Sequence, residues 1–286
     1  MIPRCVYVNG RYVHYGAARV HVEDRGFQFG DAVYEVCAIR AGRLLDLDAH
    51  LARLDRSLAA LRIAPPLGPQ PLRHVLREVV QRNLVRDGLL YLQVSRGVAE
   101  REHAFPDPAV SPTLVIFARP MNMEHLDARA ATGISVHTSP DIRWARRDIK
   151  TTGLLGNVLG KQSAREAGAS EVWFVDGQGY VTEGGSTNAW IVDRRGVLRT
   201  RELSQDILPG ITRETLLSVI HDSSLEFAEV PFTVREAQEA QEAFNTSALS
   251  FVTPVTTIDG VRLKGPQPGL VAMGLRQSYL NRVDSV

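Results

Sequence analysis

The sequence is short of lysine and cysteine, and both scarcities limit the chemistry that it can carry. Of the 33 lysines and arginines, only Lys150, Lys161 and Lys264 are lysines, so a reaction that needs a side-chain amine has three candidates. Cys5 and Cys37, the two cysteines, lie too far apart for a C-x-x-C metal site. We interpret them as free thiols of a reducing compartment.

Membrane and nucleic-acid functions find no support in the composition. No apolar run approaches the ~20 residues that a membrane helix needs, and the N-terminal MIPRCVYVNGRYV lacks the apolar core of a signal peptide. The formal net charge of +1 is too close to zero for a nucleic-acid footprint. We therefore expect a cytoplasmic protein with neither a membrane nor a nucleic-acid partner.

Turn signals and hydrophobic periodicity predict a mixed α+β protein. Asn9-Gly10 and Ala41-Gly42 each separate two short apolar runs, which is typical of hairpins. We expect helices over 48–62, 71–84, 154–167, 211–220, 234–243 and 269–282. We expect further strands over 89–97, 113–120, 134–140, 171–176, 187–193 and 226–232. The polar segment 119–133 indicates a boundary near residue 120, which divides the chain into domains 1–120 and 121–286.

Lys150 has the least ordinary setting of the three lysines. It follows Ile149 and precedes Thr-Thr-Gly, at the junction of an extended run and a helix. Lys161 lies late in a predicted helix and Lys264 in a Gly/Pro-rich turn, where solvated side chains are expected. An amine held in a cleft becomes a nucleophile toward carbonyls when it is desolvated. Spacing alone favours a solvated surface lysine at 150, so both interpretations stay open.

The stretch VTEGGSTNAW (181–190) also has two interpretations. It can be a hairpin turn in which Gly184-Gly185 supply positive φ angles and Glu183 is solvated. Alternatively, Glu183 is a buried carboxylate aimed at a cationic ring nitrogen, as pyridoxal-phosphate (PLP) chemistry requires.

Three further features can bind anions. The helix that begins at Ile211 and Thr212 after Pro-Gly offers free N–H groups and a hydroxyl to a phosphate, or is simply a capped helix. Arg53 offers a guanidinium to a phosphate, or is a solvated helix residue. Arg101 and His103, two residues apart, share one face of an extended segment and can grip one carboxylate, or form a surface pair.

Together these stretches resemble the fold-type-IV PLP enzymes, and among them the D-amino-acid transaminases. The matching segments are EDRGFQFGDAVYEV (23–36), HLARL (50–54), REHAFP (101–106), RDIKTTGLLGNVLGKQ (147–162), VTEGGSTN (181–188), LPGITRE (208–214) and NTSALSFVTPV (245–255). They occur in family order and span nearly the whole chain. The resemblance implies a two-domain α+β fold, with a smaller N-terminal α/β domain, a larger C-terminal α+β domain and PLP in the cleft.

The resemblance also implies a role for each matching residue. Lys150 corresponds to the Schiff-base lysine that holds PLP and shuttles the substrate α-proton, and Glu183 to the carboxylate that pairs with the pyridine nitrogen. The residues that correspond to the phosphate-binding positions are Arg53, Ile211, Thr212, Ser247 and Ala248. The residues expected to contact substrate are Tyr34, Val36, Arg101 and His103, of which Tyr34 and the last two form the carboxylate-binding set. In D-specific members the arginine and histidine come from the neighbouring subunit, which implies a homodimer with its active site at the interface.

Two residues depart from the pattern of the D-specific subgroup. Ala248 stands where a hydroxyl residue is usual, which removes one phosphate contact. Ala38 lies on the strand that faces the expected substrate pocket, where a longer polar residue is usual. The pocket is therefore expected to be roomier or less polar.

The predicted activity is ping-pong transamination between a D-amino acid such as D-alanine and a 2-oxo acid such as 2-oxoglutarate. A branched-chain L-amino-acid transaminase and an (R)-amine transaminase are alternatives on the same fold. A PLP lyase of the aminodeoxychorismate type is a third alternative, and a PLP-binding protein without turnover is a fourth.

Overall fold

The structure is a computed structural model that describes residues 4–284, and their contacts define two units. The first unit contains residues 4–123 together with Ile149–Gly153, and the second contains Glu124–Asp148 together with 154–284. The short segment around Lys150 therefore packs with the N-terminal part of the chain. The domains 1–120 and 121–286 stay a prediction.

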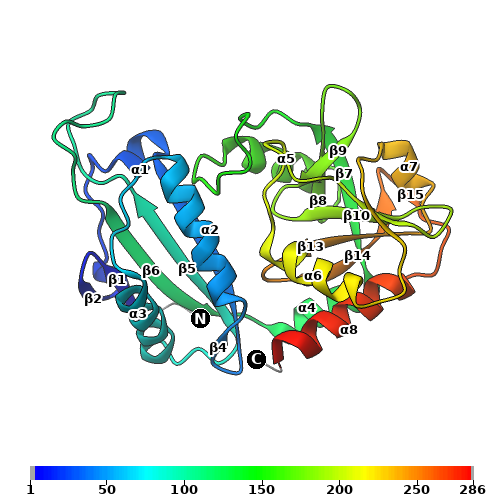
Figure 1. The fold of residues 1–286 in the computed structure, drawn as a ribbon, viewed down its shortest axis with the longest axis horizontal. Helices are drawn as coiled ribbons and strands as arrows, with labels where there is room; N and C mark the ends of the chain where they lie inside the picture. Colours follow the sequence, from blue (N-terminus) through cyan, green and yellow to red (C-terminus); the bar gives the residue numbers. More distant parts are fainter. Residues whose placement is uncertain (1–3, 285–286) are drawn as a thin grey trace. The chain divides into compact units, whose positions relative to one another are not determined.

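The first unit is a sheet covered on one face by two helices (Figure 1). Its elements are β1 (Cys5–Val8), β2 (Arg11–His14), the 3-10 helix η1 (Tyr15–Ala17), α1 (Arg25–Phe29), β3 (Ala32–Arg40), β4 (Arg43–Leu44), α2 (Leu47–Ala60), α3 (Pro69–Arg82), β5 (Gly88–Ser95) and β6 (Thr113–Pro120). The strands are antiparallel in the order β2-β1-β6-β5-β3-β4.

Local sequence explains the hairpins of this unit. Asn9 and Gly10 have φ angles of 45° and 90°, and Ala41 and Gly42 have 48° and 80°. Two successive residues with positive φ match the right-handed twist of the strands that they connect. The alternating apolar side chains then bury one face of the sheet against the apolar stripes of α2 and α3. Both predicted hairpins are confirmed.

The second unit is built on a nine-stranded mixed sheet. Its elements are α4 (Met123–Thr132), β7 (Ile134–Pro140), α5 (Leu155–Glu166), β8 (Glu171–Val175), β9 (Val181–Gly184), β10 (Asn188–Val192), β11 (Leu198–Thr200), α6 (Ile211–His221), β12 (Phe227–Glu229), α7 (Val234–Gln238), β13 (Glu242–Ser247), β14 (Phe251–Ile258), β15 (Val261–Arg262) and α8 (Leu270–Asp284). The strand order is β12-β11-β10-β13-β14-β7-β8-β9, and β15 pairs with β14. Helix α6 packs on β13, and α8 on β14.

The structure corrects several predicted elements. The helix predicted over 234–243 ends at Gln238, and Glu242 already begins β13. Helix α4 occupies the polar segment 119–133, where only a boundary was expected. Strand β9 and the pair β13–β14 were not predicted. Their side chains are buried on both faces, so they lack the alternation that marks a half-exposed strand.

Neither cysteine is part of a disulfide or a metal site in the described residues. Cys5 and Cys37 are free thiols, as the sequence indicates. Burial raises the pKa of each thiol, although the charge of Arg82 partly opposes this at Cys5. Such thiols are poor nucleophiles at neutral pH. Within residues 4–284 no group of His, Cys, Asp and Glu is arranged to hold a metal ion, and no helix is long and apolar enough to cross a bilayer.

Candidate active site

The two faces of strand β3 carry different groups. The predicted substrate-binding residues lie on one face, and a buried carboxylate lies on the other. Successive side chains of a strand point to opposite faces. Tyr34 and Val36 are half-buried on one face, and Ala38 continues that row. Glu35 points to the other face, toward α2. Tyr34 stacks on Tyr91 of β5 with ring centroids 5.7 Å apart, which extends an aromatic row along the face that carries Val36.

Lys150 lies beside the start of β3. Its backbone carbonyl accepts a hydrogen bond from the Tyr34 N–H at 3.0 Å, and Thr151 forms a β-bridge with Val33. The half-buried side chain places Nζ 4.2 Å from the centroid of the Tyr34 ring. No ion pair joins Lys150 to a carboxylate in the part of the chain that the structure describes. Its N–H group faces the hydroxyl of Ser57 at 3.4 Å, one turn after Arg53 on α2.

Arg53 is buried and held by a carboxylate, so it is not the solvated residue of the simpler interpretation. Its Nε and Nη2 each donate to a different oxygen of Glu35, at 2.8 Å in both cases. His50 Nδ1 lies 2.7 Å from the same carboxylate. Burial by itself would raise the pKa of Glu35, but the charge of Arg53 and the hydrogen bonds from Arg53 and His50 lower it to about 2. Glu35 is therefore ionised and orients Arg53.

Arg101 and His103 lie on the connection between β5 and β6 and are exposed. Both side chains contact one ring. The Arg101 guanidinium is 5.2 Å from the centroid of Phe29, and the His103 ring is 5.5 Å from it. Their shared binding of one carboxylate stays a prediction. The structure gives no contact between this pair and Tyr34 or Lys150 of the same chain.

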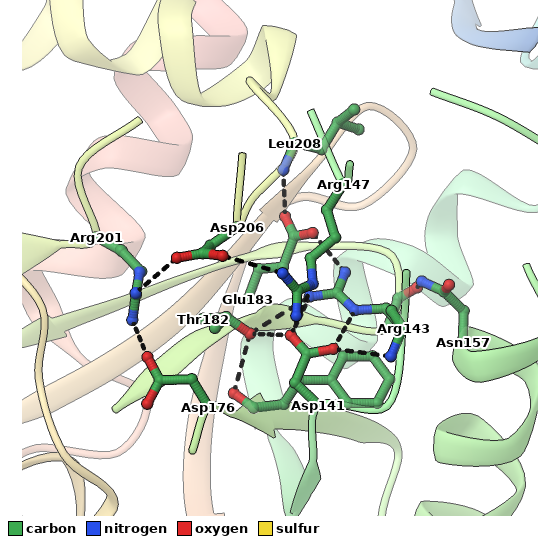
Figure 2. A network of polar contacts seen from close by, with 12 residues as sticks. Asp141, Arg143, Arg147, Asn157, Asp176, Thr182, Glu183, Arg201, Asp206 and Leu208 are labelled. Carbon is green, nitrogen blue, oxygen red and sulfur yellow. Dashed lines mark hydrogen bonds and ion pairs between the residues drawn. The ribbon is translucent and has the colours of Figure 1, made fainter. Parts of the chain in front are cut away.

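In the second unit, Glu183 is buried rather than solvated. It lies on β9 and is 5% exposed. Figure 2 shows its carboxylate between the guanidinium of Arg143, at 2.5 Å, and the N–H of Leu208, at 3.0 Å. The side-chain amide of Asn188 donates to the same carboxylate at 3.1 Å. Burial raises the pKa of Glu183, and the charge and hydrogen bond of Arg143 only partly offset this effect.

The glycines beside Glu183 are required because neighbouring atoms leave no room for a Cβ, and not because the backbone has positive φ angles. The turn interpretation assigned positive φ angles to Gly184 and Gly185, but neither has one. A Cβ at Gly184 would overlap the hydroxyl of Thr187, and one at Gly185 would lie 2.9 Å from Val172. The glycines therefore allow the chain to pack closely around the buried carboxylate.

Arg143 belongs to a network that sequence patterns did not identify. Asp141 accepts hydrogen bonds from Nε and Nη2 of Arg143, at 2.9 and 2.7 Å, and Arg147 Nε lies 3.2 Å from Asp141 (Figure 2). The hydroxyl of Thr182 also donates to Asp141. These contacts lower the pKa of Asp141 against the opposing effect of burial. The signal was present as Asp-x-Arg just after a strand, but such a pair is common on surfaces.

Asn188 contacts residues that lie next in sequence to the remaining predicted cofactor-binding residues of this unit. Its amide donates to the carbonyl of Leu208, and a Cβ at Gly210 would overlap its Oδ1. Gly210 is the N-cap of α6 and contributes no side-chain cap, so the first N–H groups, of Ile211 and Thr212, lack a helical partner. Asn188 also pairs in register with Thr246 of β13.

Ser247 and Ala248 follow at the end of β13, where both are half-buried. The Ser247 hydroxyl is 2.7 Å from that of Ser250. Ser250 thus supplies a second hydroxyl near the position where Ala248 lacks one.

The sequence indicates solvated side chains for the other two lysines, and only one of them is simply solvated. Lys264 is exposed. Lys161 is partly exposed and pairs with the buried Glu171 at 2.8 Å, so it is not simply solvated.

The comparisons with known proteins agree with this set of groups. The model of the family described as Amino-transferase class IV matches residues 32–258. The chain belongs to this family. It is 38% identical over 278 residues to the D-alanine aminotransferase of Bacillus licheniformis, covering 97% of this chain and 96% of that one. It is 35% identical over 280 residues to the D-alanine aminotransferase of Staphylococcus haemolyticus, covering 98% of both.

Among solved structures, a branched-chain amino acid aminotransferase with pyridoxamine 5′-phosphate, from the organism abbreviated T.th., has a TM-score of 0.91 at 27% identity. The alignment covers 99% of this chain and 95% of that one. This class IV aminotransferase is therefore a PLP-dependent aminotransferase with the fold-type-IV architecture, and the predicted family, fold class and cofactor are confirmed.

The residues present fit PLP. The first unit offers an amine, Lys150 Nζ, that no carboxylate neutralises within residues 4–284. The second unit offers the buried carboxylate of Glu183 for a protonated ring nitrogen and the uncapped start of α6 for a phosphate. Arg53, buried and rigidly held, adds a cation.

Replacing Glu35 by Gln should change how stability depends on pH. The folded pKa of about 2 lies below the ordinary 4.5. Glu35 therefore stabilises the fold fully above about pH 4.5, and this stabilisation is lost as the pH falls through about 2. We expect the free energy of unfolding of Glu35→Gln to lie on the order of 3 kcal/mol below wild type at pH 6. The two proteins should converge as the pH falls toward 2 in urea titrations.

The matched control is Glu78→Gln, which removes a more exposed carboxylate paired with Arg82 on α3. It should cost at most about 1 kcal/mol at pH 6. A difference between wild type and Glu35→Gln that is the same at pH 6 and pH 3 would contradict the assignment.

Proposed function

We propose that this aminotransferase moves an amino group between a D-amino acid, such as D-alanine, and a 2-oxo acid, such as 2-oxoglutarate. The observation that carries the proposal is the pair Arg101 and His103, gathered around the Phe29 ring and exposed for a partner's substrate. A guanidinium beside an imidazole is suited to bind one carboxylate with charge-assisted hydrogen bonds. The D-alanine aminotransferases of two genera, similar over nearly their whole length, support the same substrate class.

Lys150 and Glu183 are the proposed catalytic residues. Bound PLP supplies an electron sink for the charge that develops at the substrate α-carbon. The amine of Lys150 would hold the cofactor covalently and would take and return the α-proton of the substrate. Glu183 would hold the proton of the pyridine nitrogen. Its raised pKa suits this role, because a more basic carboxylate shares that proton more strongly.

The proposed phosphate-binding groups are a guanidinium, two backbone N–H groups and a hydroxyl. Arg53 supplies a guanidinium whose direction Glu35 sets. The N–H groups of Ile211 and Thr212 and the hydroxyl of Ser247 supply neutral donors. Ala248 adds no hydroxyl, and we assign it a backbone contact only. Tyr34 and Val36 are the proposed contacts of the substrate within the same chain.

A homodimer with shared active sites completes the proposal. Leu155, Val158 and Leu159 share one face of α5 and are 72%, 58% and 53% exposed. Val22, just before α1, and Phe27, within α1, are 70% and 78% exposed. Apolar side chains gathered on a surface are typical of subunit contacts. Sedimentation velocity at assay concentrations should give the mass of two chains; a single-chain mass for the active species would contradict the dimer. The cytoplasmic location stays a prediction.

A branched-chain L-amino-acid transaminase is the second candidate. The solved T.th. enzyme supports it, because it has the same fold over nearly the whole chain. The two candidates differ in where the substrate carboxylate is held, and only the D-specific one needs Arg101 and His103.

Lys150→Ala should remove the cofactor linkage and the reaction together. Borohydride reduction of the wild-type holoenzyme followed by peptide mapping should place the pyridoxyl label on Lys150. The variant should carry no label and lose transamination by a factor on the order of 10²–10⁴ or more. Lys264→Ala, which changes an exposed lysine, should behave as wild type. A label on Lys161 in the wild type would disprove the assignment.

A donor screen should separate the candidate substrates. We expect conversion of the bound cofactor to its pyridoxamine form with D-alanine, and turnover only when 2-oxoglutarate is added, which distinguishes a transaminase from a lyase. Arg101→Ala should raise KM for D-alanine by roughly 10- to 100-fold, because a charge-assisted contact is lost. Faster turnover of L-leucine or L-isoleucine than of any D-amino acid would refute the proposal, as would a preference for (R)-amines.

A further inference from the structure

The segment 96–112, which carries Arg101 and His103, contains no helix and no strand beyond an isolated bridge between Val98 and Asp24. Connections of this length are usually mobile, because few buried contacts restrain them. The hydrogen-bond donors that bind a substrate carboxylate must be held in fixed positions before the substrate arrives. The segment must therefore be held by contacts with other parts of its unit.

Arg25, at the start of α1, holds the main chain at the Arg101–His103 pair. It is 3% exposed. Its Nη1 donates to the carbonyl of Glu102 at 2.5 Å, and its Nη2 donates to the carbonyl of His103 at 3.2 Å. The planar guanidinium fork thus spans two successive peptide groups, which a lysine ammonium cannot do with the same geometry.

Asp31 fixes the direction of Arg25 and joins it to a second arginine. One carboxylate oxygen accepts from Arg25 Nε at 2.9 Å and from Arg96 Nε at 2.7 Å. The other accepts from Arg96 Nη2 at 2.9 Å. Arg96 in turn donates to the carbonyls of Leu61 and Arg62, just after α2. The three charged groups are nearly buried, and they tie the segment to α1 and to the end of α2.

The rings of Phe29 and Phe105 also restrain side chains, because they pack against arginine and histidine residues. The Phe29 ring contacts the guanidinium groups of Arg25 and Arg101 and the ring of His103. Phe105 lies 3.7 Å from the guanidinium of Arg96. Arg101 and His103, the side chains expected to bind substrate, therefore pack on the Phe29 ring, whose position depends on Arg25 and Asp31.

We propose that Arg25 and Asp31 are positioning residues that preorganise Arg101 and His103 for the substrate carboxylate. The proposal rests on the proposed function, since it assigns that pair to carboxylate binding. It gives a role to the Asp-Arg-Gly-Phe-Gln-Phe-Gly-Asp stretch (24–31), which supplies both positioning residues and the Phe29 ring. Neither residue needs to touch the substrate or the cofactor.

The test uses the purified holoenzyme and the variant Arg25→Lys, which keeps the charge beside Asp31 but loses the fork. Amide hydrogen exchange should become faster in residues 97–107, and KM for D-alanine should rise roughly tenfold or more. We expect kcat and the affinity for PLP to change less than about threefold, because Lys150 and Glu183 are untouched. Arg73→Lys, an ion-paired arginine on α3, is the matched control and should match wild type in all four measurements.

A double-variant comparison shows whether Arg25 acts through the pair. In an Arg101→Ala, His103→Ala background, Arg25→Lys should change KM by less than about twofold, because the groups that it positions are gone. If Arg25→Lys does not fold, Phe29→Leu replaces it, since that half-buried ring contacts both side chains; its KM should rise in the same direction.

The outcomes separate the two hypotheses. If Arg101→Ala raises KM while Arg25→Lys leaves KM and exchange unchanged, the positioning role is wrong and the proposed function stands. If Arg25→Lys speeds exchange without changing KM, Arg25 is merely structural and the proposal is also wrong. If Arg101→Ala itself has no effect on KM, both hypotheses fail.

Discussion

Pairing between buried carboxylates and arginine guanidinium groups is the interaction on which the proposed active site depends. Glu35 holds Arg53, Asp31 holds Arg25 and Arg96, and Glu183 is held by Arg143. A buried charge without a partner costs several kcal/mol, so each pair has essentially one arrangement once the surrounding elements are packed. Because the guanidinium is planar, a carboxylate that accepts from some of its N–H groups also fixes the direction of the remaining N–H donors. A chain with three lysines among 33 basic residues is well supplied with such groups.

Glu35 and Glu183 are both buried and both paired with an arginine, but their pKa values are shifted in opposite directions. At Glu35 the partners lower the pKa of the carboxylate to about 2, so it acts as a permanent anion that orients a neighbour. At Glu183 burial outweighs Arg143 and the pKa is raised, which suits a carboxylate that shares a proton with a cofactor. The difference follows from what the partners supply. Both oxygens of Glu35 accept from Arg53, and His50 adds a further contact. Glu183 also accepts three hydrogen bonds, but it shares its one arginine, Arg143, with Asp141, whose negative charge raises the pKa of Glu183 further.

Each unit brings together its own share of the groups through ordinary secondary structure. Alternation along β3 puts Tyr34 and Val36, the proposed substrate contacts, on one face, and Glu35, which holds the proposed phosphate-binding Arg53, on the other. In the other unit, one amide side chain, Asn188, links the strand of Glu183 to the loop before α6. Neither arrangement needs strained geometry at these residues. Ala38 and Ala248, which are expected to alter the substrate pocket and the phosphate site, are not among these supporting residues.

By itself, the sequence determined the family, the cofactor, the two hairpins and most helices, because these depend on local turn chemistry, periodicity and short motifs whose residues are near one another in the chain. It also marked Lys150 and Glu183, although only the family resemblance raised them above surface residues. Only the tertiary structure decided which groups support them. Glu35 meets Arg53 across 18 positions and Arg143 meets Glu183 across 40, and no local pattern encodes such pairs. Burial decided the rest, since the partners of a charged side chain become obligatory only when packing has removed water from it.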